Sequence, residues 1–419
     1  MTGWPLEKRD APSPFPWGFI LPFGIAQLIS WGSFYYAFTL FLEPMEHELG
    51  WHKTGLSAVY SLGIAVAGLC SPLVGRWIDR HGGRGVMTMG SVAGGLLLFA
   101  WSQVGNYPVF LAIWIGLGAV MSAVLYDPAF AVAIAVLGER ARRGITVITL
   151  IAGFASTVFV PLTHYLIGAF GWRQALIFLG LLSLLFCSGV HIVLMPRKMG
   201  RELARETHVH AGDKTKFLNS PVFWSLTACF VANYFVSTAL AVHLLPILLE
   251  RGYAIEIAVA AIASIGPAQV GARFLIAFTE RRYGIDAVGI IATLLLVAAL
   301  AILALTPPGS WIILPMTILF GLGNGTMTIV RAVSVAKFPG RTGYGSIQGA
   351  MALPIMIGEA AAPFLAAAIW TLAGGYGPVV WTLVGVSAIS ALAFAMAVAL
   401  VRSRAKPAPP SAGMGRLGS

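Results

Sequence analysis

The sequence predicts an all-α membrane protein with twelve transmembrane helices in two six-helix bundles. The 419-residue chain is 58% hydrophobic and only 10% charged, whereas an average soluble domain is about 25% charged. Twelve apolar runs are each long enough to cross a hydrocarbon core about 30 Å thick, which takes about 20 helical residues. Short motifs also recur in the two halves of the chain at a nearly constant spacing. Lipid is therefore the solvent for most of this chain.

The predicted spans follow one another with short polar connections. Helices are expected because a helix satisfies its backbone N–H and C=O groups within one segment, and the alternating strands typical of a membrane barrel are absent from the sequence. In chain order the predicted spans cover 17–42, 54–75, 85–105, 108–137, 144–169, 173–195, 221–249, 255–279, 285–306, 310–336, 343–372 and 377–401.

The longest polar interruption, "PRKMGRELARETHVHAGDKTKFLNSP", separates six spans from six. This division predicts five regions along the chain. They are an N-terminal tail (1–16), a first bundle (17–195), a central loop (196–220), a second bundle (221–401) and a C-terminal tail (402–419).

The basic residues are distributed unevenly between the two sides of the membrane. Of the 27 Lys and Arg residues, 22 fall in tails and loops on the side of the N-terminus, two lie within spans, and Lys53, Arg173 and Arg251 fall on the other side. Cytoplasmic segments of membrane proteins carry such an excess of positive charge, so both termini and the central loop are expected in the cytoplasm. The net charge of +11 is therefore a topology signal, and we expect no nucleic-acid partner.

Several motifs repeat between the two halves. Pro44 and Pro246 are 202 positions apart, and "GLGA" at 116–119 and "GLGN" at 321–324 are 205 positions apart. Parallel six-helix repeats, related by an axis along the membrane normal, are typical of many secondary transporters. The repeat therefore predicts a transporter built from two equivalent bundles.

One charged motif lies between the second and third spans. "GRWIDRHGGR" (75–84) resembles the loop signature of the major facilitator superfamily, approximately G-x-x-x-D-R-x-G-R-R, and "TERRYG" (279–284) resembles its degenerate copy between spans eight and nine. The matching residues are Gly75, Asp79, Arg80, Gly82 and Arg84, with Gly83 in place of one Arg. The resemblance implies a conformational latch between the bundles. Asp79 would accept hydrogen bonds at a helix N-terminus of the other half, and Arg80 and Arg84 would hold carboxylates or lipid phosphates. The alternative reading is plain retention of positive charge in the cytoplasm.

Within the superfamily, the first half is similar to bacterial monocarboxylate porters. The similarity lies in "PMEHELGW" (44–51) and the "TGLSAVYSLGIAVAGLCSPLVGRWIDRHGGR" stretch that follows. The D-G-G-W-G-W type of signature found at the first helix of the eukaryotic carriers is missing, and "SPFPWGFILPFG" (13–24) stands there instead. "TLIAGFASTVFVPLTHYL" (149–166) also resembles bacterial members that export metalloids, so the substrate stays open. The resemblance implies a location in the bacterial inner membrane.

Four charged residues lie inside predicted spans, where a charge is costly unless it is paired or hydrated. They are Asp127, Arg273, Arg331 and Glu359. The resemblance implies that all four line a central cavity, because they lie on spans four, eight, ten and eleven. A guanidinium such as that of Arg273 grips a carboxylate through two parallel hydrogen bonds, so Arg273 is expected to bind substrate; snorkelling or a structural ion pair is the alternative. Removal from water favours the protonated form of Glu359, which would then carry a coupled proton; a structural ion pair is the alternative.

Asp127 and Arg331 fall one residue apart when the two "GLG" motifs are superimposed. This placement predicts that they form a gate on the cytoplasmic side, with Asp127 also a candidate for proton coupling. Because Pro128 follows Asp127, a simple helix kink with Asp127 as its cap is the alternative.

Aromatic and imidazole side chains in the spans have both packing and functional readings. Trp31, Tyr35 and Tyr36 in "WGSFYY" are expected to line the substrate pocket, although membrane aromatics often only pack. The three histidines in or near spans are expected to be hydrogen-bonded in packing rather than to relay protons: His164, His191 and His243.

The function expected from these observations is secondary active transport. A small solute, with an organic anion such as a monocarboxylate preferred, would cross by proton-coupled alternating access. Export of drugs, metalloids or a vitamin-like solute is the alternative; a membrane enzyme or a channel has less support, because no zinc motif, nucleophile set or ion filter is visible in the sequence. We expect no metal, no cofactor and a monomer that contacts membrane lipids.

Overall fold

The computed structural model describes residues 15–195, 220–307, 309–337 and 344–405. Within these residues, twelve segments are long and apolar enough to cross a membrane, as the sequence predicts, and the described secondary structure is helical. Most of the two predicted tails and of the central loop, namely 1–14, 196–219 and 406–419, lies outside the described residues. The boundaries of those regions therefore stay predictions.

The first bundle contains six spans, four of which are divided into shorter helices. Its helices are α1 (Trp17–Trp31), α2 (Phe38–Leu49), α3 (Lys53–His81), α4 (Gly83–Ser102), α5 (Tyr107–Val124), α6 (Tyr126–Leu137), α7 (Ala141–Ala152), α8 (Ala155–Phe170), α9 (Trp172–Leu181) and α10 (Ser188–Leu194). One π-helical turn, Gly32–Tyr36, joins α1 to α2, and another, Leu182–Cys187, joins α9 to α10. The first span continues to Leu49, beyond the predicted end at 42, because α2 accommodates Pro44.

The second bundle has longer helices. They are α12 (Pro221–Glu250), α13 (Ile255–Ala263), α14 (Ile265–Leu305), α15 (Ile313–Lys337), α16 (Tyr344–Ala373) and α17 (Tyr376–Ala405). α14 includes the end of the eighth span and the whole ninth span, which meet at a bend at Gly284. "TERRYG" is therefore the turn of a continuous helix pair rather than an extended loop. Each bundle has its own large apolar core.

The backbone supports the internal repeat. Glycines with positive φ end equivalent helices at Gly50 and Gly252, at Gly82 and Gly284, and at Gly171 and Gly374. The members of these pairs are 202, 202 and 203 positions apart. Gly82 has φ 82° and ψ 163°, and Gly284 has φ 73° and ψ 158°, a conformation that is open only to glycine without strain. The two copies of the charged motif therefore make the same tight turn.

Two carboxylates hold the ends of the first and seventh spans in the same way. Glu48 accepts hydrogen bonds from Trp172 Nε1 at 2.5 Å and from Arg173 Nε at 2.9 Å. Glu250 accepts from Trp370 Nε1 at 2.8 Å and from the Tyr376 backbone N–H at 2.6 Å. Each carboxylate thus ties the first helix of its bundle to the start of the last one.

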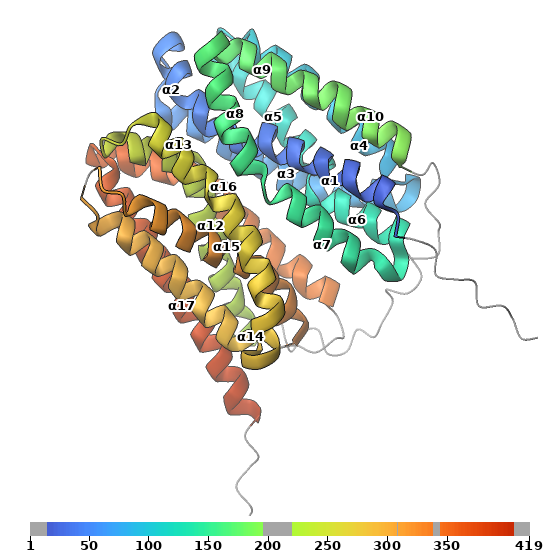
Figure 1. Cartoon of the computed structure of the whole chain (residues 1–419), viewed down its shortest axis with the longest axis vertical. Coiled ribbons are helices and arrows are strands. Elements are labelled where there is room, and N and C mark those ends of the chain that lie inside the picture. Colours follow the sequence, from blue (N-terminus) through green and yellow to red (C-terminus); the bar gives the residue numbers. More distant parts are fainter. Residues whose placement is uncertain (1–14, 196–219, 308, 338–343, 406–419) are drawn as a thin grey trace, which may run out of the picture.

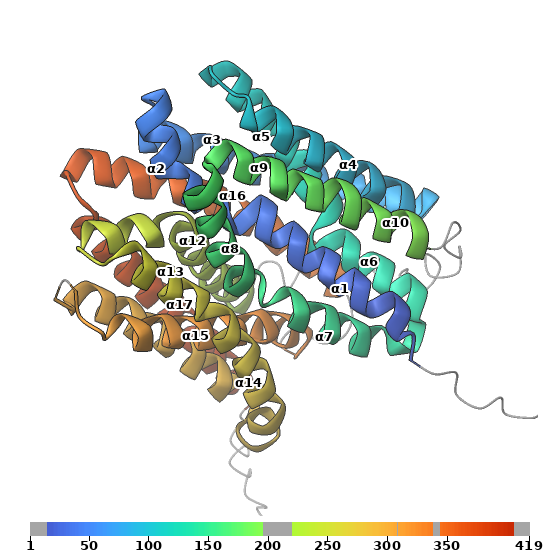
Figure 2. The same cartoon turned by 45° about the horizontal axis from the view of Figure 1, so that its top comes forward.

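The two bundles meet at one end and diverge toward the other. In Figure 1 they are closest around α2, α8 and α13, and they separate toward the start of α1 and the end of α17; Figure 2 shows the same arrangement. We call the end where they meet the closed side. Hydrogen bonds cross between the bundles there, from α3 to α16 and from α8 to α13: Thr54 with Thr371 at 2.6 Å, Ser61 with the Phe364 N–H at 3.1 Å, and Thr157 with the Ala263 carbonyl at 2.8 Å.

Candidate functional site

A small cavity of about 60 Å³ lies between the bundles. Its polar lining comes from both halves of the chain: Tyr35, Tyr36, Thr39, Ser156, Ser237, Gln269 and Asn324. Apolar side chains of α8, α12, α13, α14 and α15 complete its wall. Of the three aromatic residues expected to line the substrate pocket, Tyr35 and Tyr36 line this central cavity, whereas Trp31 is not among its lining residues.

The π-helical turn at Gly32–Tyr36 presents these tyrosines. Within it, the Ala37 N–H donates to the Gly32 carbonyl five residues earlier, at 2.9 Å. A Cβ atom at Gly32 would lie 2.1 Å from the Phe159 ring, so only glycine lets the turn pack this closely on α8. Single π turns inside helices are frequent at functional sites.

The first and seventh spans cross at the centre of the molecule. The Tyr35 hydroxyl donates to Thr238 Oγ1 at 3.3 Å, and the Thr39 hydroxyl donates to the Val242 carbonyl at 2.7 Å. Both pairs are 203 positions apart, within one position of the 202 that separates Gly50 from Gly252 at the ends of the same spans. Equivalent or directly adjacent positions of the two bundles therefore touch each other, and the pseudo-twofold axis passes close to them.

Arg273 lies on α14, one turn from Gln269 of the central cavity. Its Nη1 donates to the Thr149 carbonyl of α7, in the other bundle. The hydroxyl-bearing rings of Tyr36 and Tyr126 are near enough to interact electrostatically with the guanidinium. Within the described part of the chain, no carboxylate forms an ion pair with it. Arg273 is thus a cation one helical turn from the cavity lining, with neutral partners.

Arg331 has a different environment. Its Nη1 donates to the Tyr234 hydroxyl at 3.0 Å, and the guanidinium carbon lies 5.2 Å from the centre of that ring. Asp127 and Glu359 interact with it electrostatically, but neither makes an ion pair with it among the described residues. The predicted gate pair is therefore not in direct contact in this conformation.

The two carboxyl groups have distinct positions. Asp127 is exposed and lies in the first turn of α6, just after a break at Leu125 and near the positive end of that helix. The helix breaks here, but the N-cap residue is Leu125 and no side chain caps this end, so Asp127 is not the cap that the sequence offered as an alternative. Glu359 is half-buried on α16, between Pro354 and Pro363. It lies beside the Thr238 hydroxyl, which also meets Tyr35, and so reaches the central crossing.

The motif at 75–84 differs along its length in exposure and in contacts with neighbouring helices. Arg80 is exposed and Arg84 half-buried, while the side chain of Asp79 lies outside the described part of the structure. Gly75, which would let the end of the second span approach a neighbouring helix closely, makes no such approach in this conformation, because no described atom lies within 4 Å of a Cβ placed there. The close contact is instead at Gly83, where a Cβ would lie 2.2 Å from Val132.

Two of the three histidines have packing roles. His191 Nδ1 lies 2.9 Å from Ser91 Oγ and 3.2 Å from the Met87 carbonyl. The buried His243 ring lies 2.9 Å from the Tyr376 hydroxyl and 2.9 Å from the Pro363 carbonyl. Each ring therefore joins helices of its own bundle.

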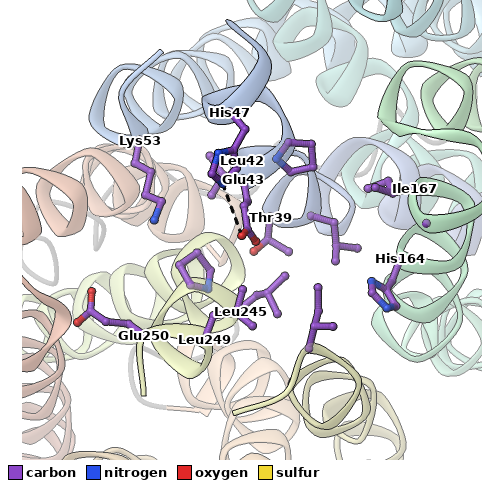
Figure 3. Close-up of a pocket in the computed structure, with 15 residues that line it drawn as sticks. Thr39, Leu42, Glu43, His47, Lys53, His164, Ile167, Leu245, Leu249 and Glu250 are labelled. Carbon is purple, nitrogen blue, oxygen red and sulfur yellow. Dashed lines mark ion pairs between the residues drawn. The ribbon is translucent and has the colours of Figure 1, made fainter. Parts of the chain in front are cut away.

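A larger cavity of about 540 Å³ lies on the closed side, and the sequence did not indicate it. Figure 3 shows His47, Lys53, His164 and Glu250 around it, with Glu43 3.9 Å from His47. Thr39 and Leu245 line both cavities. We call the larger cavity the vestibule. The layer of side chains that contains Thr39 and Leu245 separates it from the central cavity.

Sequence reasoning missed several polar groups of the central cavity. Gln269 and Asn324 line it, and Asn324 accepts a hydrogen bond from Ser237 at 2.9 Å. A usable signal was present: Gln269 is four residues before Arg273, and therefore on the same helix face. Tyr234 and Thr238 lie likewise one turn apart, in "NYFVST".

The chain is similar in fold to solved transporters and matches one family. The bacterial homologue of the human lysosomal transporter Spinster, in an inward-facing unoccupied conformation, is 12% identical with a TM-score of 0.73, over 95% of this chain and 100% of that chain. The same homologue in an inward-facing occupied conformation is 14% identical with a TM-score of 0.69, over 95% of this chain and 100% of that chain. The nucleoside transporter NupG is 17% identical with a TM-score of 0.74, over 90% of this chain and 99% of that chain. No curated protein sequence matches the chain significantly. The family model for the Major Facilitator Superfamily matches residues 23–363, and with this fold the chain belongs to that superfamily of transporters.

Proposed function

We propose that this transporter carries a small organic anion, such as a monocarboxylate, together with a proton by alternating access. The observation that carries the proposal is Arg273, a guanidinium one helical turn from the cavity-lining Gln269 and without an ion-pair partner among the described residues. A charge inside a membrane protein is expensive unless it is paired or hydrated. An anionic substrate would supply the missing counter-charge, and a carboxylate matches the two-pronged geometry of the guanidinium.

The charges of the cavity also support one proton for each anion. Arg331 interacts electrostatically with two carboxylates, Asp127 and Glu359, whereas Arg273 forms no ion pair with a described carboxylate. If Glu359 takes up the proton, Asp127 still neutralises Arg331 and the substrate neutralises Arg273. The loaded cavity is then neutral, which lowers the cost of moving it across the membrane.

The conformation supports alternating access. The closed side seals the central cavity through the layer of Thr39 and Leu245, and the bundles diverge at the opposite end (Figure 1). If both termini lie in the cytoplasm, as the basic residues predict, this state faces inward and the vestibule faces outward. Asp127 and Arg331 would then pair when the inner side closes, and Asp79 would latch the motif at 75–84 to the other bundle.

Uptake into proteoliposomes tests this function. Purified protein should accumulate labelled monocarboxylates when the interior is alkaline, with no response to membrane potential if one proton accompanies each anion. Arg273→Lys should weaken the affinity, because a point charge replaces a planar fork, and Arg273→Gln should nearly abolish transport. Arg402→Gln is a matched control, since Arg402 is exposed on α17 and lies 4.0 Å from Asp286. If Arg273→Gln retains its affinity and pH dependence, the organic-anion proposal fails and export of a neutral or cationic solute replaces it.

A further inference from the structure

Aromatic rings of the first bundle gather opposite Arg273. The Trp31 ring centre lies 4.7 Å from that of Tyr126 and 5.2 Å from that of Tyr35, and Tyr35 lies 5.2 Å from Tyr36. These separations fall in the range of favourable edge-to-face and tilted ring pairs. Tyr36 and Tyr126 also interact with the Arg273 guanidinium. One cation from the second bundle therefore faces an aromatic wall from the first.

This wall is not closed off by its own packing. Trp31, Tyr36 and Tyr126 are each half-buried. Trp31 Nε1 is buried and has no hydrogen-bond partner among the described residues. Buried indole N–H groups usually find an acceptor, since an unmade hydrogen bond is costly. A ligand with an acceptor atom beside the wall would satisfy it.

The internal repeat provides a comparison for Trp31. Gly50 and Gly252 are 202 positions apart, and the π turn at Gly32–Tyr36 adds one residue to the first span, whereas α12 is a continuous α-helix. Before that turn, the residue equivalent to Trp31 is therefore Tyr234, 203 positions later. Tyr234 is occupied on both its polar tip and its ring, because Arg331 of the same bundle donates to its hydroxyl and lies over its face. The cation that faces the aromatic wall of Trp31 is Arg273 of the second bundle, and it donates to the Thr149 carbonyl instead. The aromatic position is thus satisfied in one bundle and open in the other.

We propose that the central site prefers a planar aromatic monocarboxylate over an aliphatic one. The carboxylate would meet Arg273 and the hydroxyls of Tyr36 and Tyr126, the ring would pack on Trp31 and Tyr126, and an acceptor atom of the ligand would take the Trp31 N–H. This inference rests on the proposed function, because it assumes that Arg273 binds a carboxylate. It adds the shape and electronic character of the substrate.

Calorimetric binding to the purified full-length chain tests the preference with two matched probes. Benzoate and cyclohexanecarboxylate have the same carboxylate and the same number of ring carbons, but only benzoate has a π-system. We expect benzoate to bind about 2- to 12-fold more tightly, the gain associated with a favourable aromatic pair. Equal affinities would overturn the inference while leaving the proposed function standing. Binding of either acid that survives Arg273→Gln would instead overturn the proposed function.

Two variants separate recognition from packing. Trp31→Leu should remove most of the benzoate preference and change cyclohexanecarboxylate binding less than the benzoate affinity. Trp31→Phe keeps the ring and removes the N–H, so it should retain the benzoate preference and lose any added affinity for 4-hydroxybenzoate or nicotinate over benzoate. An equal loss for both ring acids in Trp31→Leu would indicate a purely structural Trp31 and refute the inference. Unchanged affinities for all probes in both variants would refute it as well.

Discussion

Closure of the central cavity depends on a glycine at the crossing of α8 and α14. A Cβ atom at Gly266 would lie 2.1 Å from Thr157 Oγ1 and 2.9 Å from the Gly153 carbonyl oxygen. The Thr157 hydroxyl is itself engaged, because it donates to the Ala263 carbonyl at 2.8 Å. Gly266→Leu therefore forces a side chain into a contact that includes backbone, and the two bundles must separate on the closed side to admit it.

The magnitude follows from the cost of overpacking. Extra carbon atoms in a well-packed interior typically cost about 1–3 kcal/mol, and an energy of that size changes the ratio of two conformations about 5- to 150-fold. The cost applies only to the state in which α8 touches α14. Gly266→Leu should therefore shift the population by this factor toward the state that is open on the vestibule side.

Spin labels report this shift without reference to membrane orientation. Cysteines at Phe170 on α8 and Ile257 on α13 are suited to labelling, since these side chains are 62% and 50% exposed and belong to different bundles. In a background without the three native cysteines, Gly266→Leu should enrich the longer of the inter-label distances. Gly271→Leu on the same helix is the control, because nothing lies within 4 Å of a Cβ placed there.

The control removes the ordinary effects of adding a leucine to a membrane helix. Both variants replace glycine by leucine in α14, so they share the same gain in helix propensity. If the distance distribution of Gly266→Leu equals that of the native chain, or if Gly271→Leu shifts it equally, the contact at Gly266 does not control closure and the reasoning is refuted.

Three further outcomes are expected. Neutralising Asp127 or Arg331 alone should slow turnover, and exchanging the two charges should restore part of it; strictly additive losses in proteoliposome uptake would count against the gate. Asp79→Asn should impair uptake while expression and substrate binding persist, and native rates in that variant would remove the latch. A cysteine at Gly138 should react with an impermeant thiol reagent only from the cytoplasmic side, whereas labelling from outside intact cells would reverse the topology.

The helical architecture could be predicted because membrane thickness imposes a length on every apolar run. Residues such as Arg273 and Glu359 could be predicted as site residues because a charged side chain in lipid is costly unless it is paired or hydrated. Which neutral polar residues face the cavity was less accessible. Gln269 and Asn324 are uncharged, so their presence in a span is not a signal by itself. They face the cavity because of the rotation of their helices, which is set by packing in three dimensions.

The local helix geometry could not be predicted from the sequence for a related reason. Nothing in the hydropathy of "WGSFYY" distinguishes a π turn from an α-helix, because both bury the same side chains in lipid or protein. The turn at Gly32–Tyr36 depends on the approach of Phe159 from another helix. The vestibule likewise arises only when distant ends of α2, α8, α12 and α13 meet.

The crossing of the first and seventh spans bears on why the two halves are one chain. In a symmetric pair of separate, identical bundles, a residue on the twofold axis would meet its own copy, so Tyr35 would face a second tyrosine. Two phenol rings cannot occupy the space in which Tyr35 now reaches Thr238 at 3.3 Å. Covalent fusion frees the axial positions to differ, so that one half contributes bulk and the other a small hydroxyl. The fused chain therefore has an asymmetric centre, in which Glu359 lies beside the smaller partner, Thr238. A pair of identical subunits could not form this arrangement.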